Sequence, residues 1–575
     1  MKTSALALAA VLVLAAGSRD LAGQASLPPA STPASPAAAP APSLGAAMSL
    51  LQSGDAAGAA RMLEAVTAKE PQNGRAWRNL AVARTQLRDS DGAIAALERS
   101  LAVEPAIPTP LYLIAKVHAA RNDKERTLEW LGKAKASGKL DLSQAEVDPE
   151  FAFLRADPRF AAVLPQPADF ERPFVEPVTV LREWDGESAG DQFGWIARNL
   201  GDVDGDGIPD VVTSAPTRNV GGENAGRIYV YSTKSGKLLW TADGQPGDQL
   251  GTGVEGAGDT NADGVPDVIA GAPNGGKAFV YSGRDGKVLR SFVAESANDQ
   301  LGRHTCGVGD LDHDGFGDVL VGAPGNNAGG EGAGRAYVYS GKDGKVLLTL
   351  TGERAGDAFG STVAGYSDTA RSFLMVGAPG AGPTHHGRVY VYGGLAASPQ
   401  FVFEADETGA ALGQMFLSVP GDMDGDGVPD LYASDWSNRA KGPSTGRVYV
   451  HSGKDGRRFL TLTGEGPGDG FGTSPSPAGD VDGDGYADLI VGAWQYGGAA
   501  MSGGRCYLYS GKDGRLVKTF TSRVPGDTLG FDAVGMGDVD GDGTVDFLLT
   551  SAWSAIHGNH SGRMFIVSSG VVRKK

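Results

Sequence analysis

A nine-residue acidic segment of the form Asp-x-Asp/Asn-x-Asp-Gly-x-x-Asp occurs six times between residues 202 and 546, and a short apolar run follows each copy. The copies begin at Asp202, Asp259, Asp310, Asp422, Asp480 and Asp538. Most neighbouring copies are about 55 residues apart, and the interval between the third and the fourth is twice as long. A period of this kind predicts a chain made of repeated structural units.

The residue types at fixed positions of the segment predict a metal-binding loop. Positions 1, 3, 5 and 9 supply carboxylate or amide oxygens, and position 6 is glycine in every copy, which permits the sharp turn that wraps one ion. Hard oxygen donors in this spacing are typical of calcium sites, to which the carbonyl oxygen of position 7 can add a ligand. We therefore expect about six calcium ions. The predicted ligands are Asp202, Asp204, Asp206, Ile208, Asp210, Asp259, Asn261, Asp263, Val265, Asp267, Asp310, Asp312, Asp314, Phe316, Asp318, Asp422, Asp424, Asp426, Val428, Asp430, Asp480, Asp482, Asp484, Tyr486, Asp488, Asp538, Asp540, Asp542, Thr544 and Asp546.

Two other interpretations of the acidic segment fit less well. An EF-hand needs an acidic residue at position 12 and a helix on each side, whereas position 12 is here Thr213, Ala270, Val321, Ala433, Val491 or Leu549. Simple solvated turns need only one or two such residues. The net charge of −17 is therefore assigned mostly to ion binding, and without a basic stripe we expect no nucleic-acid partner.

Each repeated unit is predicted to form four short strands. A glycine-rich strand precedes the acidic loop, an apolar strand follows it, and an Asp-Gly turn joins the last two strands as a hairpin. The long interval contains one further unit, in which residues 366–371 stand where the acidic loop would be. We therefore predict seven units and six ions. Seven four-stranded units without intervening helices predict an all-β seven-bladed β-propeller. Because the last unit lacks a fourth strand, we expect Val178–Trp184 to complete blade seven.

The units resemble FG-GAP repeats, which form the head of integrin α-subunits and occur in many secreted bacterial proteins. The FG position is held by Phe193-Gly194, Leu250-Gly251, Leu301-Gly302, Phe359-Gly360, Leu412-Gly413, Phe471-Gly472 and Leu529-Gly530. The GAP position is held by Ser214-Ala215-Pro216, Gly271-Ala272-Pro273, Gly322-Ala323-Pro324 and Gly377-Ala378-Pro379. The resemblance covers residues 178–575 and implies the propeller fold, with ligands bound on the rim opposite the calcium loops. It says little about function, because one architecture hosts many roles.

The N-terminal part of the chain has a different composition. Residues 1–25 combine Lys2, an apolar stretch and small residues, which predicts a signal peptide and an exported protein that is secreted, periplasmic or on the cell surface. The apolar stretch is too short to span a bilayer, so we expect no membrane span. Residues 26–43 are rich in proline and alanine and are predicted to be a linker.

Residues 44–164 predict a small α-helical domain that resembles tetratricopeptide repeats. Pro71 and Pro105 are separated by the period of that family, and between them lie apolar and small residues at its helix-packing positions: Trp77, Leu80, Ala81, Gly92, Ala93, Ala96 and Leu97. Residues 142–164 resemble a terminal cap, and residues 165–177 are predicted to be a linker. The resemblance implies a groove that binds a protein or peptide. The alternative is that the helices act only as a spacer.

The order of the strands places the acidic loops and the Asp-Gly hairpins on one rim of the propeller. The opposite rim then carries the longer, more varied loops, on which binding functions tend to lie. On that rim tryptophan replaces the proline of the GAP motif in the last three units. With nearby aromatic residues these tryptophans could form a stacking platform for a sugar or a peptide, or they could fill the gaps between blades. The candidate ligand residues are Trp436, Trp494, Tyr496, Trp553, His557 and His560.

No catalytic motif is recognisable, so we predict that the protein is not an enzyme. The leading hypothesis is a secreted, calcium-stabilised interaction or adhesion protein. Its propeller rim would bind a protein or glycan ligand, and its helical arm a second protein. Two alternatives stay open: an enzyme that acts on extracellular polysaccharide, as a lyase or hydrolase, and a purely structural cell-surface scaffold.

Overall fold

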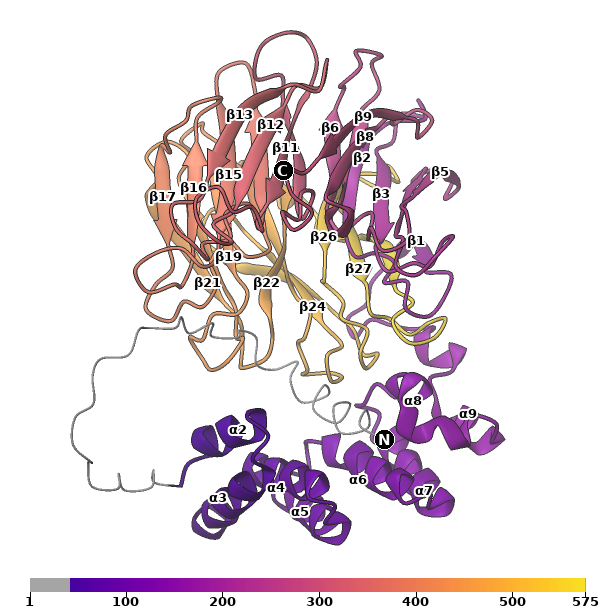
Figure 1. The fold of residues 1–575 in the computed structure, drawn as a ribbon. Coiled ribbons are helices and arrows are strands. Elements are labelled where there is room, and N and C mark those ends of the chain that lie inside the picture. Colours follow the sequence, from indigo (N-terminus) through magenta and orange to yellow (C-terminus); the bar gives the residue numbers. More distant parts are fainter. Residues whose placement is uncertain (1–41, 574–575) are drawn as a thin grey trace, which may run out of the picture. The chain divides into compact units, whose positions relative to one another are not determined.

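The computed structural model describes residues 42–573 and divides into two compact units between Pro165 and Gln166. The first unit is helical and the second is built of β-sheets (Figure 1). The predicted signal peptide and most of the first predicted linker lie outside the described residues.

Antiparallel helix pairs form the first unit, as the tetratricopeptide resemblance implies. Six of the helices are capped by an Asp or Asn side chain that accepts a bond from a backbone amide of the first turn, for example Asp89 from the Gly92 amide at 2.9 Å. Small residues allow close packing, because Ala81, Ala93 and Ala96 are almost fully buried. The helices are α2 (Leu44–Gln52), α3 (Ala56–Lys69), α4 (Gly74–Gln86), α5 (Ser90–Val103), α6 (Thr109–Ala120), α7 (Lys124–Ala136), α8 (Gln144–Val147), η1 (Pro149–Leu154) and α9 (Pro158–Val163).

Seven four-stranded antiparallel sheets form the second unit, which confirms the predicted seven-bladed propeller. From the inner to the outer strand, blade 1 contains β2 (Ala197–Gly201), β3 (Asp210–Ala215), β4 (Arg227–Tyr231) and β5 (Leu238–Asp243). Blade 2 contains β6 (Val254–Gly258), β7 (Asp267–Ala272), β8 (Lys277–Tyr281) and β9 (Val288–Val293). Blade 3 contains β10 (Thr305–Gly309), β11 (Asp318–Ala323), β12 (Arg335–Tyr339) and β13 (Val346–Thr351). Blade 4 contains β14 (Val363–Ser367), β15 (Ser372–Ala378), β16 (Arg388–Tyr392) and β17 (Phe401–Glu404). Blade 5 contains β18 (Leu417–Gly421), β19 (Asp430–Asp435), β20 (Arg447–His451) and β21 (Arg458–Thr463). Blade 6 contains β22 (Phe471–Gly479), β23 (Asp488–Ala493), β24 (Arg505–Tyr509) and β25 (Leu516–Thr521). Blade 7 contains β26 (Ala533–Gly537), β27 (Asp546–Ser551), β28 (Arg563–Ser568) and β1 (Val180–Asp185). The short helices η2 (Pro167–Phe170) and η3 (Pro273–Gly275) belong to the same unit.

In blades 1 to 3 the second strand is more buried than the first and the fourth strands. The second strand is buried along its whole length in blades 1 to 3 and 5 to 7, as in β3 and β27, because neighbouring blades cover both faces. The fourth strand is largely exposed, and Val293 of β9 is 71% exposed. The core of the propeller therefore lies between the blades.

The glycines of the repeated motifs allow neighbouring blades to approach closely. A Cβ atom on Gly271, in the GAP motif of blade 2, would lie 1.8 Å from the carbonyl oxygen of Gly302, in the FG motif of blade 3. Gly302 itself has a φ of +88°, and a Cβ there would lie 2.5 Å from the carbonyl oxygen of Lys277 in blade 2. Both motifs are thus explained by contact between backbones.

The ring is closed by strands from distant parts of the sequence. β1 pairs antiparallel with β28, with Trp184 opposite Met564, so residues from the start of the propeller supply the fourth strand of blade 7 (Figure 1).

The structure differs from the sequence prediction at residues 165–177, which were expected to be a linker. Phe174 forms a bridge with Ser522 beyond the end of β25 and packs against Phe565, while the Glu176 carboxylate accepts a bond from the Thr521 amide at 2.7 Å. Burial of two aromatic side chains, Phe170 and Phe174, fixes this segment on blades 6 and 7.

Candidate metal loops and ligand rim

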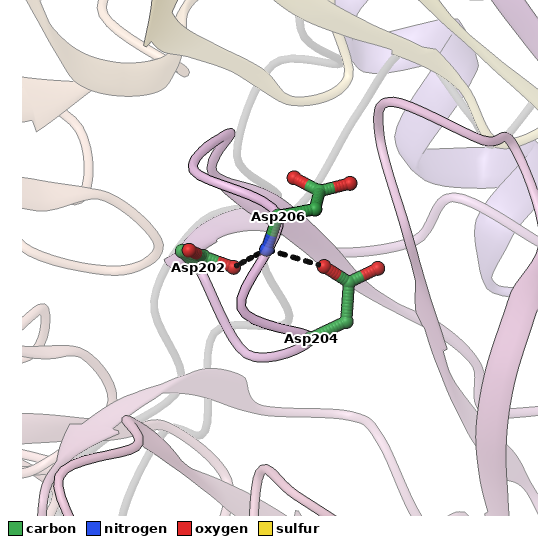
Figure 2. Close-up of side chains that lie close together, drawn as sticks. All are labelled: Asp202, Asp204 and Asp206. Atoms are coloured by element: carbon green, nitrogen blue, oxygen red, sulfur yellow. Dashed lines mark hydrogen bonds between the residues drawn. The ribbon is translucent and has the colours of Figure 1, made fainter.

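Each acidic loop is folded around its own first aspartate. In blade 1 the Asp202 carboxylate accepts bonds from the amides of Gly205, Asp206 and Gly207 at 2.7–3.1 Å. Figure 2 shows the Asp206 amide, which also donates to Asp204 at 3.1 Å. At position 7, the Ile208 amide donates to the Asp206 carboxylate at 3.0 Å, and the position-7 amides of the other five loops make the same bond. These bonds hold the carboxylates on one side of a tight turn.

Within residues 42–573, five of the six loops bring three aspartates within reach of a single ion. One oxygen of each lies within 4.8 Å of the others in the groups Asp202, Asp204 and Asp206; Asp310, Asp312 and Asp318; Asp422, Asp424 and Asp430; Asp480, Asp482 and Asp488; and Asp538, Asp540 and Asp542. In the loop of blade 2, Asn261 occupies the third position, and the three aspartates there, Asp259, Asp263 and Asp267, do not form such a group among the described residues.

In five blades the ninth residue of the loop links the loop to the hairpin between the third and fourth strands. One oxygen of Asp488 accepts the Val481 amide at 2.8 Å, and the other accepts the Gly511 amide, from the hairpin between the third and fourth strands, at 3.1 Å. Equivalent bonds occur in blades 1, 2, 3 and 5. Burial raises the pKa of these carboxyls, to about 7 for Asp430 and about 6 for Asp210.

Blade 7 is the exception, because its fourth strand, β1, does not follow β28 through a hairpin. Asp546 Oδ2 accepts the Val539 amide at 2.8 Å, but Asp546 Oδ1 is buried and has no hydrogen-bond partner among the described residues. Burial raises the pKa of Asp546 to about 6.

Basic residues of the hairpins face the acidic loops. Arg457 and Arg515 form ion pairs of 2.9 and 3.0 Å with Asp424 and Asp482, and Lys342, Lys454 and Lys512 lie 3.7–4.0 Å from the position-5 carboxylates. The loops and hairpins therefore lie on the same rim, as the strand order predicted. The donor set on this rim consists of oxygens alone, which fits a hard cation such as calcium and not a transition metal.

On the opposite rim, three predicted tryptophans form one cluster. The ring centres of Trp494 and Trp553 are 4.8 Å apart, those of Trp436 and Trp494 are 6.4 Å apart, and both pairs meet edge to face. His560 stacks on Trp553 at 5.2 Å. Trp494 is buried at the centre, whereas Trp436 and Trp553 are half-buried. One tryptophan thus fills the interior, and its two neighbours reach the surface.

Two predicted rim residues lie apart from this cluster. Tyr496 lies beneath the Arg505 guanidinium, 3.9 Å from it, and the His557 ring lies 3.5 Å from Asp185 of β1. The cluster instead includes Phe531, 5.6 Å from Trp494, and Trp195, 4.6 Å from Phe531. The sequence prediction missed both, although each directly follows an FG motif and could have been found by comparing that position between repeats.

Comparison with known proteins agrees with this geometry. Sequence models of the FG-GAP repeat match residues 193–231 and 305–339, and a model of the FG-GAP-like repeat matches 422–491 and 480–549. The propeller is built from FG-GAP repeats. A model of the tetratricopeptide repeat matches residues 44–109 of the helical unit.

The FG-GAP propeller is related to parts of much longer proteins. Phosphatidylinositol-glycan-specific phospholipase D of Rattus norvegicus is 33% identical over 178 residues, 27% of this chain and 21% of the relative. Integrin alpha-4 of Xenopus laevis is 30% identical over 202 residues, 31% of this chain and 18% of the relative. Integrin alpha pat-2 of Caenorhabditis briggsae is 32% identical over 212 residues, 31% of this chain and 17% of the relative. The chain spans about a fifth of the length of the curated relatives it matches.

The inner strands of the FG-GAP propeller hold a buried ion cluster beside the tryptophans. Arg198 of β2 lies between Glu255 of β6, at 2.6 Å, and Asp532, which immediately precedes β26 and is fully buried. Burial raises the pKa of both carboxyls, while Arg198 counteracts the shift. The cluster joins blades 1, 2 and 7 where the ring closes.

Among the described residues, no helix has both the length and the apolar composition needed to cross a membrane.

Proposed function

We propose that this protein is an exported, calcium-stabilised interaction protein. In this proposal the rim opposite the acidic loops binds a protein or glycan ligand, and the tetratricopeptide unit binds a second protein or peptide. The relation of the repeats to integrin alpha supports an interaction role. The N-terminal sequence supports export.

The observation that carries the ligand proposal is the half-buried state of Trp436 and Trp553 around the buried Trp494. Indole faces that reach solvent beside other aromatic rings suit stacking on a sugar or an apolar side chain. Loops with this role need a rigid support, which the packed inner strands supply.

Calcium has a structural role in this proposal. The residues suited to hold it are the aspartates at positions 1, 3 and 5 in blades 1 and 7 and those at positions 1, 3 and 9 in blades 3, 5 and 6. A bound divalent ion would neutralise carboxylates that otherwise repel one another, and we expect a stabilised fold rather than catalysis.

A polysaccharide-acting enzyme is the second candidate, and the Arg198 cluster favours it. Two carboxyls with raised pKa near an aromatic surface resemble the groups that acid–base chemistry on sugars uses. In this candidate Glu255, whose side chain is partly exposed, would exchange a proton with the substrate. Release of new reducing or unsaturated sugar ends, abolished by Glu255→Gln, would favour it over the binding role.

The proposal is tested by binding of the full chain to immobilised glycans and peptides in calcium. We expect a ligand whose binding is lost in Trp553→Ala and kept in Tyr366→Ala, which removes a partly buried aromatic ring from the strand before the loop that lacks the metal motif. Equal binding by both variants would reject the tryptophan rim as the ligand site.

A further inference from the structure

Seven equivalent residues surround the inner strands on the tryptophan rim, and we call them the mouth ring. Each directly follows the glycine of an FG motif and lies at or just before the start of an innermost strand, and these strands are neighbours around the propeller. The mouth ring consists of Trp195, Thr252, Arg303, Ser361, Gln414, Thr473 and Phe531.

The mouth ring is chemically divided between aromatic and polar blades. Trp195 and Phe531, in blades 1 and 7, are in ring contact and extend the tryptophan cluster. Trp195 also donates its Nε1 hydrogen to the carbonyl oxygen of Thr252 at 3.3 Å, which links the aromatic part to blade 2. Arg303 lies in the next blade.

Arg303 is the one polar member of the mouth ring without a side-chain partner among the described residues. The hydroxyls of Thr252, Ser361 and Thr473 donate to backbone carbonyl oxygens at 2.7–2.9 Å. The side-chain oxygen of Gln414 accepts the Trp436 indole hydrogen at 3.0 Å. No ion pair or side-chain hydrogen bond of Arg303 occurs in residues 42–573, although its side chain is exposed.

Among the described residues, no carboxylate forms an ion pair with Arg303. The protein around it removes part of its hydration and lowers its pKa, even though solvent reaches the side chain. The neighbouring His304 is neutral, because burial and the charges of Arg198 and Arg303 lower its pKa to about 3. Glu255 and Asp532 are both engaged by Arg198.

We propose that the mouth ring binds an acidic glycan, with the carboxylate of a uronic acid paired to Arg303 and the sugar ring against the half-buried indoles. This inference rests on the proposed ligand role of the rim and names its ligand class. A free guanidinium pairs with a carboxylate in two parallel hydrogen bonds. It also repels the cationic groups that aromatic clusters otherwise attract.

The size of the mouth ring favours a glycan over a protein surface. A stable protein interface uses about 20–30 residues on each side, whereas Thr252, Thr473 and Phe531 are buried, and the other four members of the mouth ring offer one free charge. A sugar unit presents an apolar face, which can stack on an indole, and a few polar groups, which can bond to a guanidinium.

The test is calorimetric titration of the full chain with tetragalacturonate and with the same oligosaccharide after reduction of its carboxyl groups. We expect tetragalacturonate to bind, Arg303→Gln to weaken this binding about tenfold or more, and the reduced oligosaccharide to bind weakly and equally to both proteins. Arg439→Gln is the matched control, because Arg439 is an exposed arginine on a loop of the same rim. An unchanged melting temperature shows that each variant is folded.

Four results would overturn the inference. If the reduced oligosaccharide binds as tightly as the acidic one, or if Arg303→Gln binds tetragalacturonate as the unaltered chain does, the acidic class is wrong while the rim remains a ligand site. Binding of an acidic peptide but of neither oligosaccharide, lost in Arg303→Gln, would assign the mouth ring to a protein partner. If no oligosaccharide binds, the inference fails, and the Trp553→Ala comparison decides the proposed function separately.

Discussion

The two rims of the propeller are made by the same seven units and differ in how strictly they repeat. On the acidic rim six blades carry nearly the same nine residues, with the same internal hydrogen bonds. On the tryptophan rim the residue after the FG motif differs in most blades, and the GAP proline becomes tryptophan in three. Strict repetition indicates a requirement of folding, and variation within a constant scaffold indicates recognition.

Removal of calcium is expected to have the largest effect, because it acts on every loop of the acidic rim. If the dissociation constant of each site is about tenfold below the ambient calcium concentration, binding stabilises the fold by about 1.4 kcal/mol per site. Six independent sites then contribute on the order of 8 kcal/mol. Thermal unfolding in calcium and in a chelator measures this difference. An unchanged melting temperature would contradict a structural role for the metal.

Substitution of two tryptophans separates packing from binding on the other rim. Trp494→Ala removes a buried ring and should cost about 3–5 kcal/mol of unfolding free energy, whereas Trp553→Ala should cost less and mainly reduce ligand binding. Denaturant unfolding and binding assays of both variants check this. Similar losses of stability would show that both rings serve only the interior.

Two aspartates at position 9 of the acidic loops test how much the hydrogen bond to the hairpin contributes to stability. In Asp488→Asn one backbone N–H donor would face the side-chain NH₂ group of the new asparagine. In chelator we therefore expect the unfolding free energy to fall by about 2 kcal/mol. Asp546→Asn should cost less, because Asp546 Oδ1 has no donor opposite it among the described residues. Equal losses in unfolding experiments would mean that the hairpin bond contributes nothing.

Calcium should abolish or reverse the pH dependence of stability that the buried carboxyls cause. In chelator, the buried Asp430 has a pKa of about 7, above the value of about 3.9 in an unfolded chain. A carboxyl that binds protons more tightly when folded stabilises the fold at low pH, so stability should fall as the pH rises from about 4 to about 7. Calcium favours the ionised form, and melting curves in calcium should lose or reverse this trend. The same slope in both conditions would argue against binding at these carboxylates.

The smallest effect is expected for the hairpin cations. Lys512 lies 4.0 Å from Asp484 and is half-exposed, so Lys512→Gln should change the unfolding free energy by less than about 1 kcal/mol. Chelator-induced unfolding of this variant tests whether a lysine replaces the ion. A loss of several kcal/mol in chelator would show that it does.

The sequence was sufficient for the architecture because the motifs that define it are local. The FG and GAP glycines and the acidic loops occur at fixed spacing, and each has a backbone reason visible in a single unit or a neighbouring pair. The composition of the aromatic cluster was only partly predictable. Trp195 and Phe531 are distant in the sequence and meet only because the ring closes, and Phe174 docks on blade 7 without any periodic pattern around it. Contacts that depend on closure leave no signal in a single unit.

The pairing of β1 with β28 also bears on the order of events during synthesis. β1 leaves the ribosome nearly 400 residues before its partner strand, and until then it has no partner within blade 7. An unpaired strand edge is a site for association with other chains, so the nascent protein spends most of its translation with an open end to protect. A chain released before β28 is made could not close the ring, which gives the cell a clear physical difference between finished and unfinished copies.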